Sequence, residues 1–303
     1  MLSSLRPTPI AQLSATNVSQ ITAARRELGE KTLSFEFFPP RDEAAEITLW
    51  RTFDAIMQAG ADYVSVTYGA GGSNQERTLA VTERMAPQIA TIGHLTCVGA
   101  TKAHSSQIIK SFEDHGVSSV LALRGDSPKD NPNALLQGEL KTALDLVNLT
   151  REVSSLEVGV AAFPEVHPES PSLSHDVHVL KLKESAGAKF AITQLFFSVD
   201  AYLELVNKAE AAGIALEIIP GVMPIANAKQ VLRMAEMSNA KVPTNLYEQL
   251  ADADAATARR IGMDYTLDLG AQLLAIGAPG LHIFTLNQQK AALELAEGVG
   301  LVR

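Results

Sequence analysis

A carboxylate stands inside an apolar run near the start of the chain. The stretch TLSFEFFPPRDE, residues 32–43, places Glu36 among phenylalanines and shortly before Pro39 and Pro40. Burying an ionised carboxylate without a partner costs more free energy than a short strand gains, so the group must be paired, hydrated or protonated. A protonated carboxyl group in such surroundings can serve as a general acid. A salt bridge to an arginine such as Arg124 is the structural alternative.

Further polar residues stand within or directly after other short apolar runs. They include a histidine, an amide and an Arg-Gly-Asp sequence whose Asp126 could equally form a turn. The YGAGGS sequence, residues 68–73, has backbone N–H groups that could closely approach a phosphate or a flat ring. The candidate residues are Thr67, His94, Arg124, Gly125, Asp126 and Gln194.

Eight short runs rich in β-branched and aromatic residues predict the strands that would position these groups. They cover residues 32–38, 62–68, 91–97, 118–124, 157–163, 190–196, 215–221 and 280–286. Between them, apolar residues at spacings of three and four predict helices, for example over 45–61 and 198–214. This alternation is typical of parallel strands joined by crossover helices.

Eight such units in 303 residues predict an α/β fold, a closed (β/α)₈ barrel of the TIM type. The rival is an open doubly wound sheet, which a G-x-G-x-x-G turn after the first strand would favour, but that turn reads PPRDE. No linker divides the chain, so we expect one domain: a barrel over 31–303 and an N-terminal helical extension over 1–30. At least two helices should fill the gap at 222–279. Glu36 and the other candidates should then meet at the rim formed by the carboxyl ends of the strands.

Composition narrows the classes of partner and compartment. The net charge is −9, whereas a nucleic-acid binder would usually carry a basic face. We find no apolar run long enough to span a membrane and no apolar block of a signal peptide at the N-terminus. The single cysteine, Cys97, suits a reducing compartment. We therefore expect a cytoplasmic protein that binds neither nucleic acid nor membrane.

Histidines gather in HPESPSLSHDVH, which covers residues 167–178. His167, His175, Asp176 and His178 could suggest a metal site, but no second ligand cluster completes one. We expect no metal.

Several motifs carry a resemblance that covers residues 32–300. SFEFFPPR, VSVTYGAGGS, HLTC, LALRGD, VAAFPEVHPE, AITQLFF, PGVMP and TLN stand here in the order found in methylenetetrahydrofolate reductases of the bacterial type. The resemblance implies a flavoprotein barrel that reduces 5,10-methylenetetrahydrofolate to 5-methyltetrahydrofolate in a ping-pong cycle. It also implies bound FAD, NADH or NADPH as electron donor, and a homo-oligomer.

The resemblance assigns roles to individual residues. Glu36 would be the general acid that protonates N5 of the folate, Asp126 would stabilise the cation that follows, and Gln194 would hold the pterin. Arg124 and Lys183 would be the cations that face the pyrophosphate or ring oxygens of FAD. The residues matched to flavin contacts are Thr67, His94, Arg124, Gly125, Asp126, Ala161, Phe163, His167, Asp176 and Lys183.

Five positions depart from many relatives, and other functions stay open. The departures are Phe163, Val179, Leu182, Ala228 and Gln288, which bear on FAD affinity, substrate stacking and the folate tail. The alternatives are a flavin-independent reductase with direct hydride transfer, a pterin-binding barrel of the methyltransferase type and a non-catalytic binding protein. Because the chain ends soon after the eighth strand and its helix, we expect no C-terminal regulatory domain.

Overall fold

The computed structural model describes residues 16–68, 72–127 and 131–303. In these ranges the chain forms nine strands, all in one parallel sheet, and twelve α-helices. The strands are β1 (Thr32–Phe37), β2 (Tyr63–Val66), β3 (Ala90–Thr96), β4 (Ser119–Leu123), β5 (Glu157–Ala162), β6 (Phe190–Thr193), β7 (Glu217–Ile219), β8 (Gly221–Val222) and β9 (Gly280–Phe284). The helices are α1 (Val18–Glu27), α2 (Glu43–Gln58), α3 (Gly72–Met85), α4 (Lys102–Asp114), α5 (Ala134–Gln137), α6 (Ala143–Val153), α7 (Leu173–Ser185), α8 (Val199–Ala211), α9 (Ala228–Ser238), α10 (Thr244–Asp252), α11 (Ala255–Ala275) and α12 (Gln289–Gly298).

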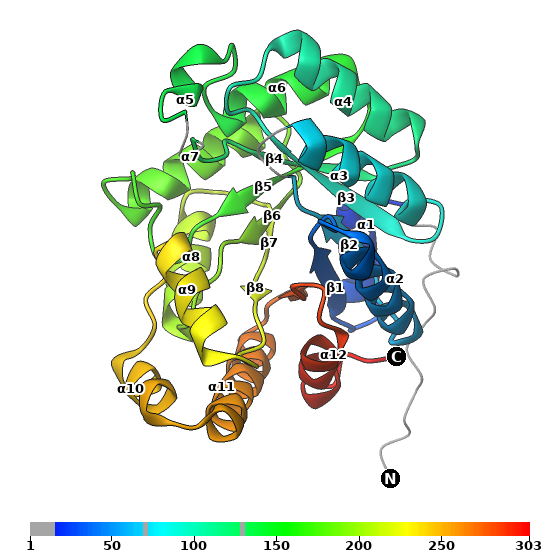
Figure 1. Cartoon of the computed structure of the whole chain (residues 1–303). Coiled ribbons are helices and arrows are strands. Elements are labelled where there is room, and N and C mark those ends of the chain that lie inside the picture. The colour runs from blue at the N-terminus through cyan, green and yellow to red at the C-terminus, as the bar shows by residue number, and fades with distance from the viewer. Residues whose placement is uncertain (1–15, 69–71, 128–130) are drawn as a thin grey trace.

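The sheet closes on itself through a strand that is broken at Pro220. β7 pairs with β6 on one side of the break, and β8 pairs with β9 on the other. Proline has no N–H to donate to a strand ladder, but the carbonyl of Pro220 still accepts a hydrogen bond from the His282 amide at 3.0 Å. β7 and β8 thus correspond to the single predicted strand at 215–221. The (β/α)₈ barrel is confirmed, with its helices arranged around the strands (Figure 1).

Alternate residues of β1 face opposite sides, as the strand period requires. Leu33, Phe35 and Phe37 point outward into the main hydrophobic core, where they join residues of α2 such as Phe53. The rings of Phe37 and Phe53 meet edge to face, with centroids 6.2 Å apart. The side chain of Ser34 points into the barrel, where it contacts the ring of His282. Glu36, two residues further on, shares that inward face.

Large side chains fill the amino-terminal half of the barrel interior. Tyr63, Ile92, Leu121, Phe190, Ile192 and Ile219 form one buried cluster with Val18 and Ile21 of α1. α1 therefore covers the amino-terminal opening of the barrel. Gly159 makes room for Phe190, because a Cβ atom at Gly159 would lie 2.3 Å from that ring. The packed half leaves the polar interior residues at the other end. An N-terminal helix is thus present, and the predicted boundary at residue 30 stays a prediction.

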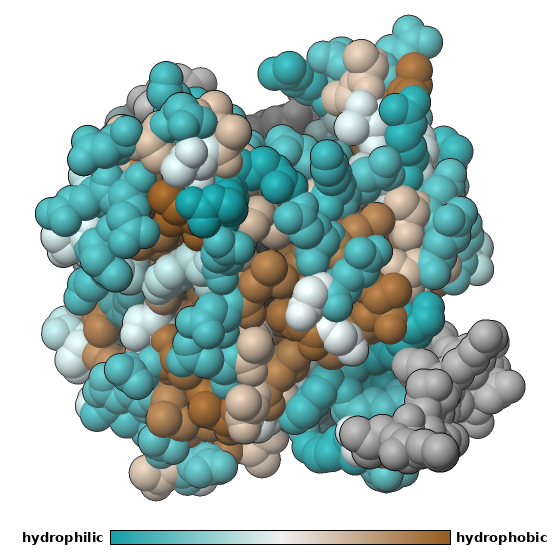
Figure 2. All heavy atoms as spheres, turned by 90° about the horizontal axis from the view of Figure 1, so that it is seen from below, coloured by the Kyte–Doolittle hydropathy of each residue, from teal (hydrophilic) through white to brown (hydrophobic). Residues whose placement is uncertain are grey.

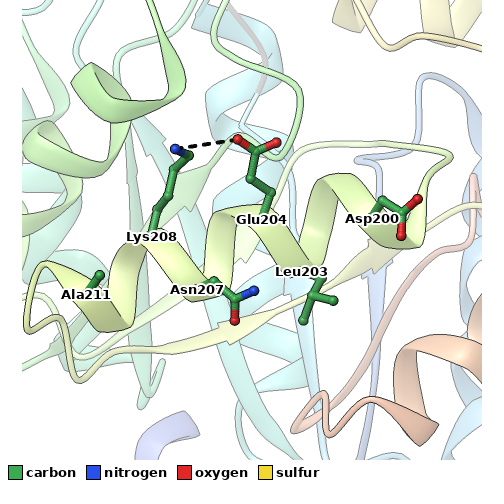
Figure 3. Close-up of a pocket in the computed structure, with 6 residues that line it drawn as sticks. All are labelled: Asp200, Leu203, Glu204, Asn207, Lys208 and Ala211. Atoms are coloured by element: carbon green, nitrogen blue, oxygen red, sulfur yellow. Dashed lines mark ion pairs between the residues drawn. The ribbon is translucent and has the colours of Figure 1, made fainter.

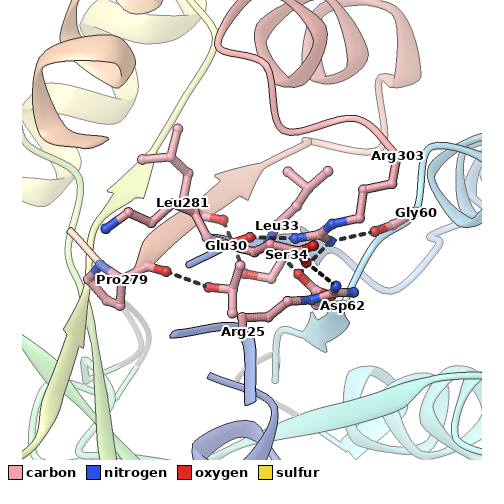
Figure 4. A network of polar contacts seen from close by, with 11 residues as sticks. Arg25, Glu30, Leu33, Ser34, Gly60, Asp62, Pro279, Leu281 and Arg303 are labelled. Carbon is pink, nitrogen blue, oxygen red and sulfur yellow. Dashed lines mark hydrogen bonds and ion pairs between the residues drawn. The ribbon is translucent and has the colours of Figure 1, made fainter. Parts of the chain in front are cut away.

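A buried ionic network ties α1 and the last residue of the chain to the start of β2 (Figure 4). One carboxylate oxygen of Asp62 accepts hydrogen bonds from Nε and Nη2 of Arg25, at 2.9 and 2.8 Å. The other oxygen accepts from Nη1 of Arg303 at 2.6 Å and from the Leu33 amide at 2.8 Å. Asp62 is completely buried and Arg25 is 1% exposed, so these charges depend on one another rather than on water.

Replacing Asp62 by asparagine is expected to lower the free energy of unfolding by about 3–5 kcal/mol, because Arg25 and Arg303 lose the carboxylate that they share, although Arg25 keeps its ion pair with Glu30. Chemical denaturation monitored by circular dichroism measures this change. The control is Asp264→Asn, which breaks an exposed ion pair with Arg260 and should cost less than about 1 kcal/mol. Equal small losses in the two variants would show that the buried network contributes little stability.

Three helices, one more than the predicted minimum, lie between β8 and β9, and two of them form an excursion beside the strand ends. α9 and α10 share a second hydrophobic cluster with Leu195 and Phe197, which follow β6. A carboxylate oxygen of Glu165, in the loop after β5, accepts a hydrogen bond from the Lys241 amide at 2.6 Å. Burial raises the pKa of the Glu165 carboxyl group. The α9–α10 excursion is thereby attached to the loops at the carboxyl ends of β5 and β6.

Candidate active site

The end of β1, which carries Glu36, is held in place by the turn after β9. The Glu36 carbonyl accepts hydrogen bonds from the hydroxyl and the amide of Thr285, at 2.6 and 3.2 Å. The side chain of Asn287 donates to the Phe38 carbonyl at 2.8 Å and accepts from the Phe38 amide at 3.0 Å. Leu286 and Asn287 both adopt left-handed backbone angles, which makes this turn tight. The turn after β9 therefore fixes the backbone at Glu36 and at Phe38.

Two buried histidines face the Glu36 carboxyl group. Nε2 of His94 on β3 lies 3.6 Å from Oε2 of Glu36, and Nε2 of His282 on β9 lies 3.8 Å from the same atom. Burial lowers the pKa of His94 to about 4, against the opposing effect of Glu36, so this ring is neutral at neutral pH. The structure thus places a carboxyl group between two imidazoles at the mouth of the barrel.

Arg124, at the end of β4, forms its ion pair with Glu169 rather than with Glu36. Its Nη1 and Nη2 atoms donate to the two carboxylate oxygens at 2.5 and 2.8 Å. The hydrogen bonds with Glu169 raise the pKa of the Arg124 guanidinium group. The salt-bridge alternative for Glu36 is therefore wrong.

Gly125 and Asp126 continue this strand end into solvent. Gly125 has a φ of +80°, and a Cβ atom there would lie 2.8 Å from Val98 and 2.9 Å from Thr96. Only glycine fits this backbone without strain. Asp126 follows with an exposed side chain. The tight glycine turn thus presents the Asp126 carboxylate at the rim, where a bound molecule could meet it.

Four predicted cofactor contacts form one group around the loop after β5. The rings of Phe163 and His167 meet edge to face at 4.7 Å between centroids. The His167 amide donates to Oδ2 of Asp176, in the first turn of α7, at 2.9 Å. Lys183 lies two turns further along α7, where burial lowers the pKa of its ammonium group while Asp176 acts in the opposite direction. The structure thus brings a half-buried cation and its carboxylate neighbour to this loop.

The remaining predicted residues lie at other strand ends. The amide of Thr67, just after β2, donates to the Phe37 carbonyl at 2.9 Å. Ala161 is half-buried near the end of β5, and Gln194 directly follows β6, where its Oε1 accepts from the Leu195 amide at 2.8 Å. In the described ranges, neither Asp126 nor Gln194 forms a hydrogen bond or ion pair with Glu36. Residues 69–71 of the glycine-rich sequence lie outside the described residues.

The described part of the chain offers neither a metal centre nor a membrane-spanning helix. It holds no group of three or more histidine, cysteine, aspartate or glutamate side chains that could bind a metal. None of its helices is long and apolar enough to cross a membrane. A hollow of about 430 Å³ runs along the outer face of α8 (Figure 3). Its lining, from Asp200 to Ala211, includes none of the predicted site residues.

The sequence that forms this barrel and its rim matches a known protein family. A family model described as methylenetetrahydrofolate reductase matches residues 20–300. The chain belongs to the methylenetetrahydrofolate reductase family.

Members of the methylenetetrahydrofolate reductase family in bacteria match this chain along most of its length. The 5,10-methylenetetrahydrofolate reductases of Salmonella typhimurium and Escherichia coli are each 36% identical over 277 residues, covering 90% of this chain and 92% of theirs. The methylenetetrahydrofolate reductase (NADH) 1 of Arabidopsis thaliana is 35% identical over 293 residues, which are 91% of this chain but 49% of the plant protein.

A solved structure from Clostridium thermocellum is similar in fold. It is described as an uncharacterized protein that binds two copies of 5-methyl-5,6,7,8-tetrahydrofolic acid. The match has a TM-score of 0.63 with 14% sequence identity and covers 93% of this chain and 97% of the other. At this sequence identity, the similarity supports the barrel fold and nothing further.

Three features of this reductase-family site were not predicted as parts of it. Glu169 lies within HPESPSLSHDVH, but nothing in its spacing indicates a bond to Arg124. Thr285 and Asn287 belong to the quoted TLN sequence, to which we assigned no structural role. His282 precedes Phe284 by two residues in a predicted strand, and this spacing could have indicated that it faces the barrel interior.

Proposed function

We propose that the protein reduces 5,10-methylenetetrahydrofolate to 5-methyltetrahydrofolate, with NADH or NADPH as electron donor and with bound FAD. Membership of the reductase family supports the reaction class. The observation that carries the proposal is the buried carboxyl group of Glu36 between His94 and His282 at the barrel mouth. A protein that only binds folate or flavin needs no buried acid at this place.

Glu36 is the general acid in this proposal. The amine at N5 of the substrate is a poor leaving group until it is protonated, so opening of the five-membered ring needs a proton donor. The fixed backbone of β1 holds the donor still, and the apolar outer face of the strand anchors it to α2. Asp126 supplies a negative charge at the rim where the substrate becomes cationic, and Gln194 supplies an amide for the edge of the pterin.

The residues at the ends of β4 and β5 fit a flat, anionic cofactor such as FAD. Lys183 is a half-buried cation whose charged neighbour is Asp176, so an added anion would relieve its desolvation. His94 has a buried Nε2 atom without a hydrogen-bond partner among the described residues. When bound and reduced, FAD supplies the hydride for the exocyclic methylene carbon. The residues that would hold FAD are Thr67, His94, Arg124, Gly125, Asp126, Ala161, Phe163, His167, Asp176 and Lys183.

Lys183→Ala is expected to lower the affinity for FAD by about 10- to 100-fold, the effect of losing one charge-assisted contact. Fluorescence titration of the apoprotein with FAD measures this affinity without any turnover. The matched control is Lys189→Ala, which removes an exposed lysine just before β6, at the amino-terminal end of the barrel. Equal FAD affinity in the Lys183 variant and the control would show that Lys183 does not hold the cofactor.

A product assay tests the function against its alternatives. Purified protein is supplied with NADH or NADPH and 5,10-methylenetetrahydrofolate, and folate products are separated by chromatography. The proposal predicts 5-methyltetrahydrofolate from a protein that releases FAD on denaturation. The same product from a flavin-free protein would indicate direct hydride transfer. Absence of the product would favour the methyltransferase-type or non-catalytic barrel.

We also propose that the protein works in the cytoplasm as a homo-oligomer. Its single cysteine, Cys97, is buried, and burial raises its thiol pKa to about 11, which suits a structural rather than a reactive thiol. The exposed large apolar side chains are spread over many elements, from Leu28 after α1 to Ile276 after α11. Hydrophilic residues also interrupt the apolar areas on the face seen in Figure 2. Light scattering measures the oligomeric state directly.

A further inference from the structure

We propose that His282 is a positioning residue for Glu36. Its Nε2–H group donates a hydrogen bond to the Glu36 carboxylate after Glu36 has given its proton to the substrate. This inference rests on the proposed function, in which Glu36 gives its proton to the substrate. It concerns a residue below the site that touches neither folate nor cofactor in the proposed arrangement. Four observations around the imidazole carry it.

The ring of His282 is completely buried and held on its faces and edges. It stacks with Tyr63 at 6.4 Å between ring centroids and 13° between planes, and it meets Phe284 edge to face at 5.8 Å. Phe284 is itself packed above Gly221, where a Cβ atom would lie 2.4 Å from the phenylalanine ring. An imidazole locked in this way keeps its nitrogen atoms at fixed positions.

Both nitrogen atoms of His282 contact hydroxyl groups. Nδ1 lies 2.8 Å from Oγ of Ser34, and Nε2 lies 3.1 Å from Oγ of Ser65. The Ser34 hydroxyl has a second acceptor within reach, the Leu281 carbonyl, at the longer distance of 3.3 Å. Because Nδ1 is the nearer acceptor, we infer that the Ser34 hydroxyl donates its hydrogen bond to Nδ1 and keeps its own proton. A neutral ring then carries its own proton on Nε2.

That Nε2–H group points toward Ser65 and the Glu36 carboxyl group. The separation of 3.8 Å from Oε2 of Glu36 is too long for a hydrogen bond, and a small rotation of the glutamate side chain would shorten it. Once Glu36 has given up its proton, it is a carboxylate in a largely buried place, where lack of a donor is costly. When the Glu36 side chain turns toward His282, its carboxylate accepts a hydrogen bond from Nε2–H, which compensates the new charge.

The other ionisable groups packed around Glu36 do not offer an equally fixed donor. His94 on β3 is neutral at neutral pH, and its Nε2 has no hydrogen-bond partner in the described part of the chain to set its orientation. Tyr63 on β2 lies on the far side of the His282 ring, and burial raises the pKa of its hydroxyl group. His282 is the group whose orientation two hydroxyls define.

Two variants of His282 separate positioning from packing. The amide nitrogen of glutamine can replace Nε2 of histidine, whereas the shorter asparagine places its amide near Nδ1. We expect His282→Asn to slow reduction of the folate by about 10- to 100-fold, the effect of losing a hydrogen bond to a charged group. Oxidation of NADH should be unchanged in this variant. His282→Gln should restore most of the folate rate.

A double-mutant cycle with Glu36→Gln shows whether His282 acts through Glu36. In the Glu36→Gln background, His282→Asn should cause no further loss. Three results would overturn the inference. His282→Asn alone could slow NADH oxidation and folate reduction equally, or it could slow neither. In the double variant, His282→Asn could add its full loss to that of Glu36→Gln. A normal folate step in Glu36→Gln alone would instead remove Glu36 as the acid, which is a failure of the proposed function.

Nuclear magnetic resonance of the unchanged protein gives a readout that requires no turnover and no folded variant of His282. In protein labelled with ¹⁵N-histidine, His94 and His282 should give the signals of buried histidines. The buried-histidine signal that remains in His94→Gln then belongs to His282. We expect His282 to be the Nε2–H tautomer at neutral pH. The Nδ1–H tautomer would contradict the inference even if no His282 variant folds.

Discussion

Glu36→Gln is expected to slow the reduction of 5,10-methylenetetrahydrofolate by about 10²–10⁴-fold, the range that a general acid contributes. Glutamine keeps the size and shape of the side chain, so the packing of β1 should survive. The substitution removes the transferable proton, without which N5 cannot leave. Oxidation of NADH by the bound flavin needs no proton from this residue and should stay within about tenfold of the unchanged protein.

Stopped-flow absorbance separates the two half-reactions of this variant. Oxidised protein is mixed with NADH, and reduced protein is then mixed with the folate, with flavin absorbance followed each time. Glu152→Gln serves as the control, because it makes the same carboxyl-to-amide change at an exposed position near the end of α6. Equal losses in both half-reactions of Glu36→Gln would make Glu36 structural, and a normal folate step would assign the acid role elsewhere.

Asp126→Asn is expected to retain the fold and the flavin but to slow the folate step by about 10²–10³-fold, the effect of deleting one preorganised electrostatic group. The lost charge no longer stabilises the cation that forms when the substrate ring opens. The flavin should also become easier to reduce, because a neighbouring negative charge has been removed. Stopped-flow rates and a redox titration measure the two effects.

A distant aspartate provides the control for this charge change. Asp114→Asn alters an exposed residue at the end of α4, and we expect neither the folate rate nor the flavin potential to respond. An unchanged folate rate in Asp126→Asn would remove Asp126 from the mechanism. A slower rate with an unchanged potential would place Asp126 near the folate but not near the flavin.

The barrel could be predicted because its signals are local and repeated. Each run of β-branched and aromatic residues carries its own strand preference, and eight of them separated by helical segments leave few topologies. The break at Pro220 was not predicted, although the missing N–H of proline explains it. The inward direction of Glu36 followed from simple alternation along β1, which the contacts with His94 and His282 confirm.

The partners of the site residues were harder to predict, because they depend on how side chains from distant strands meet. Arg124 was expected to face a cofactor, with a salt bridge to Glu36 as the alternative, and the loop after β5 brings Glu169 to it in place of Glu36. His282 lies 246 positions after Glu36 in the chain, and only the register of β9 beside β1 places it under the carboxyl group. The resemblance supplied residue roles, whereas these contacts required the structure.

The most direct test of the proposed reaction is a single anaerobic cycle followed by flavin absorbance. NADH or NADPH is added in an amount equal to the bound flavin, and 5,10-methylenetetrahydrofolate follows after the absorbance has settled. We expect the yellow absorbance to bleach with the nucleotide and to return with the folate, with one 5-methyltetrahydrofolate formed for each flavin reoxidised. A flavin that stays bleached when the folate is added, or that returns without forming 5-methyltetrahydrofolate, would contradict the proposed function.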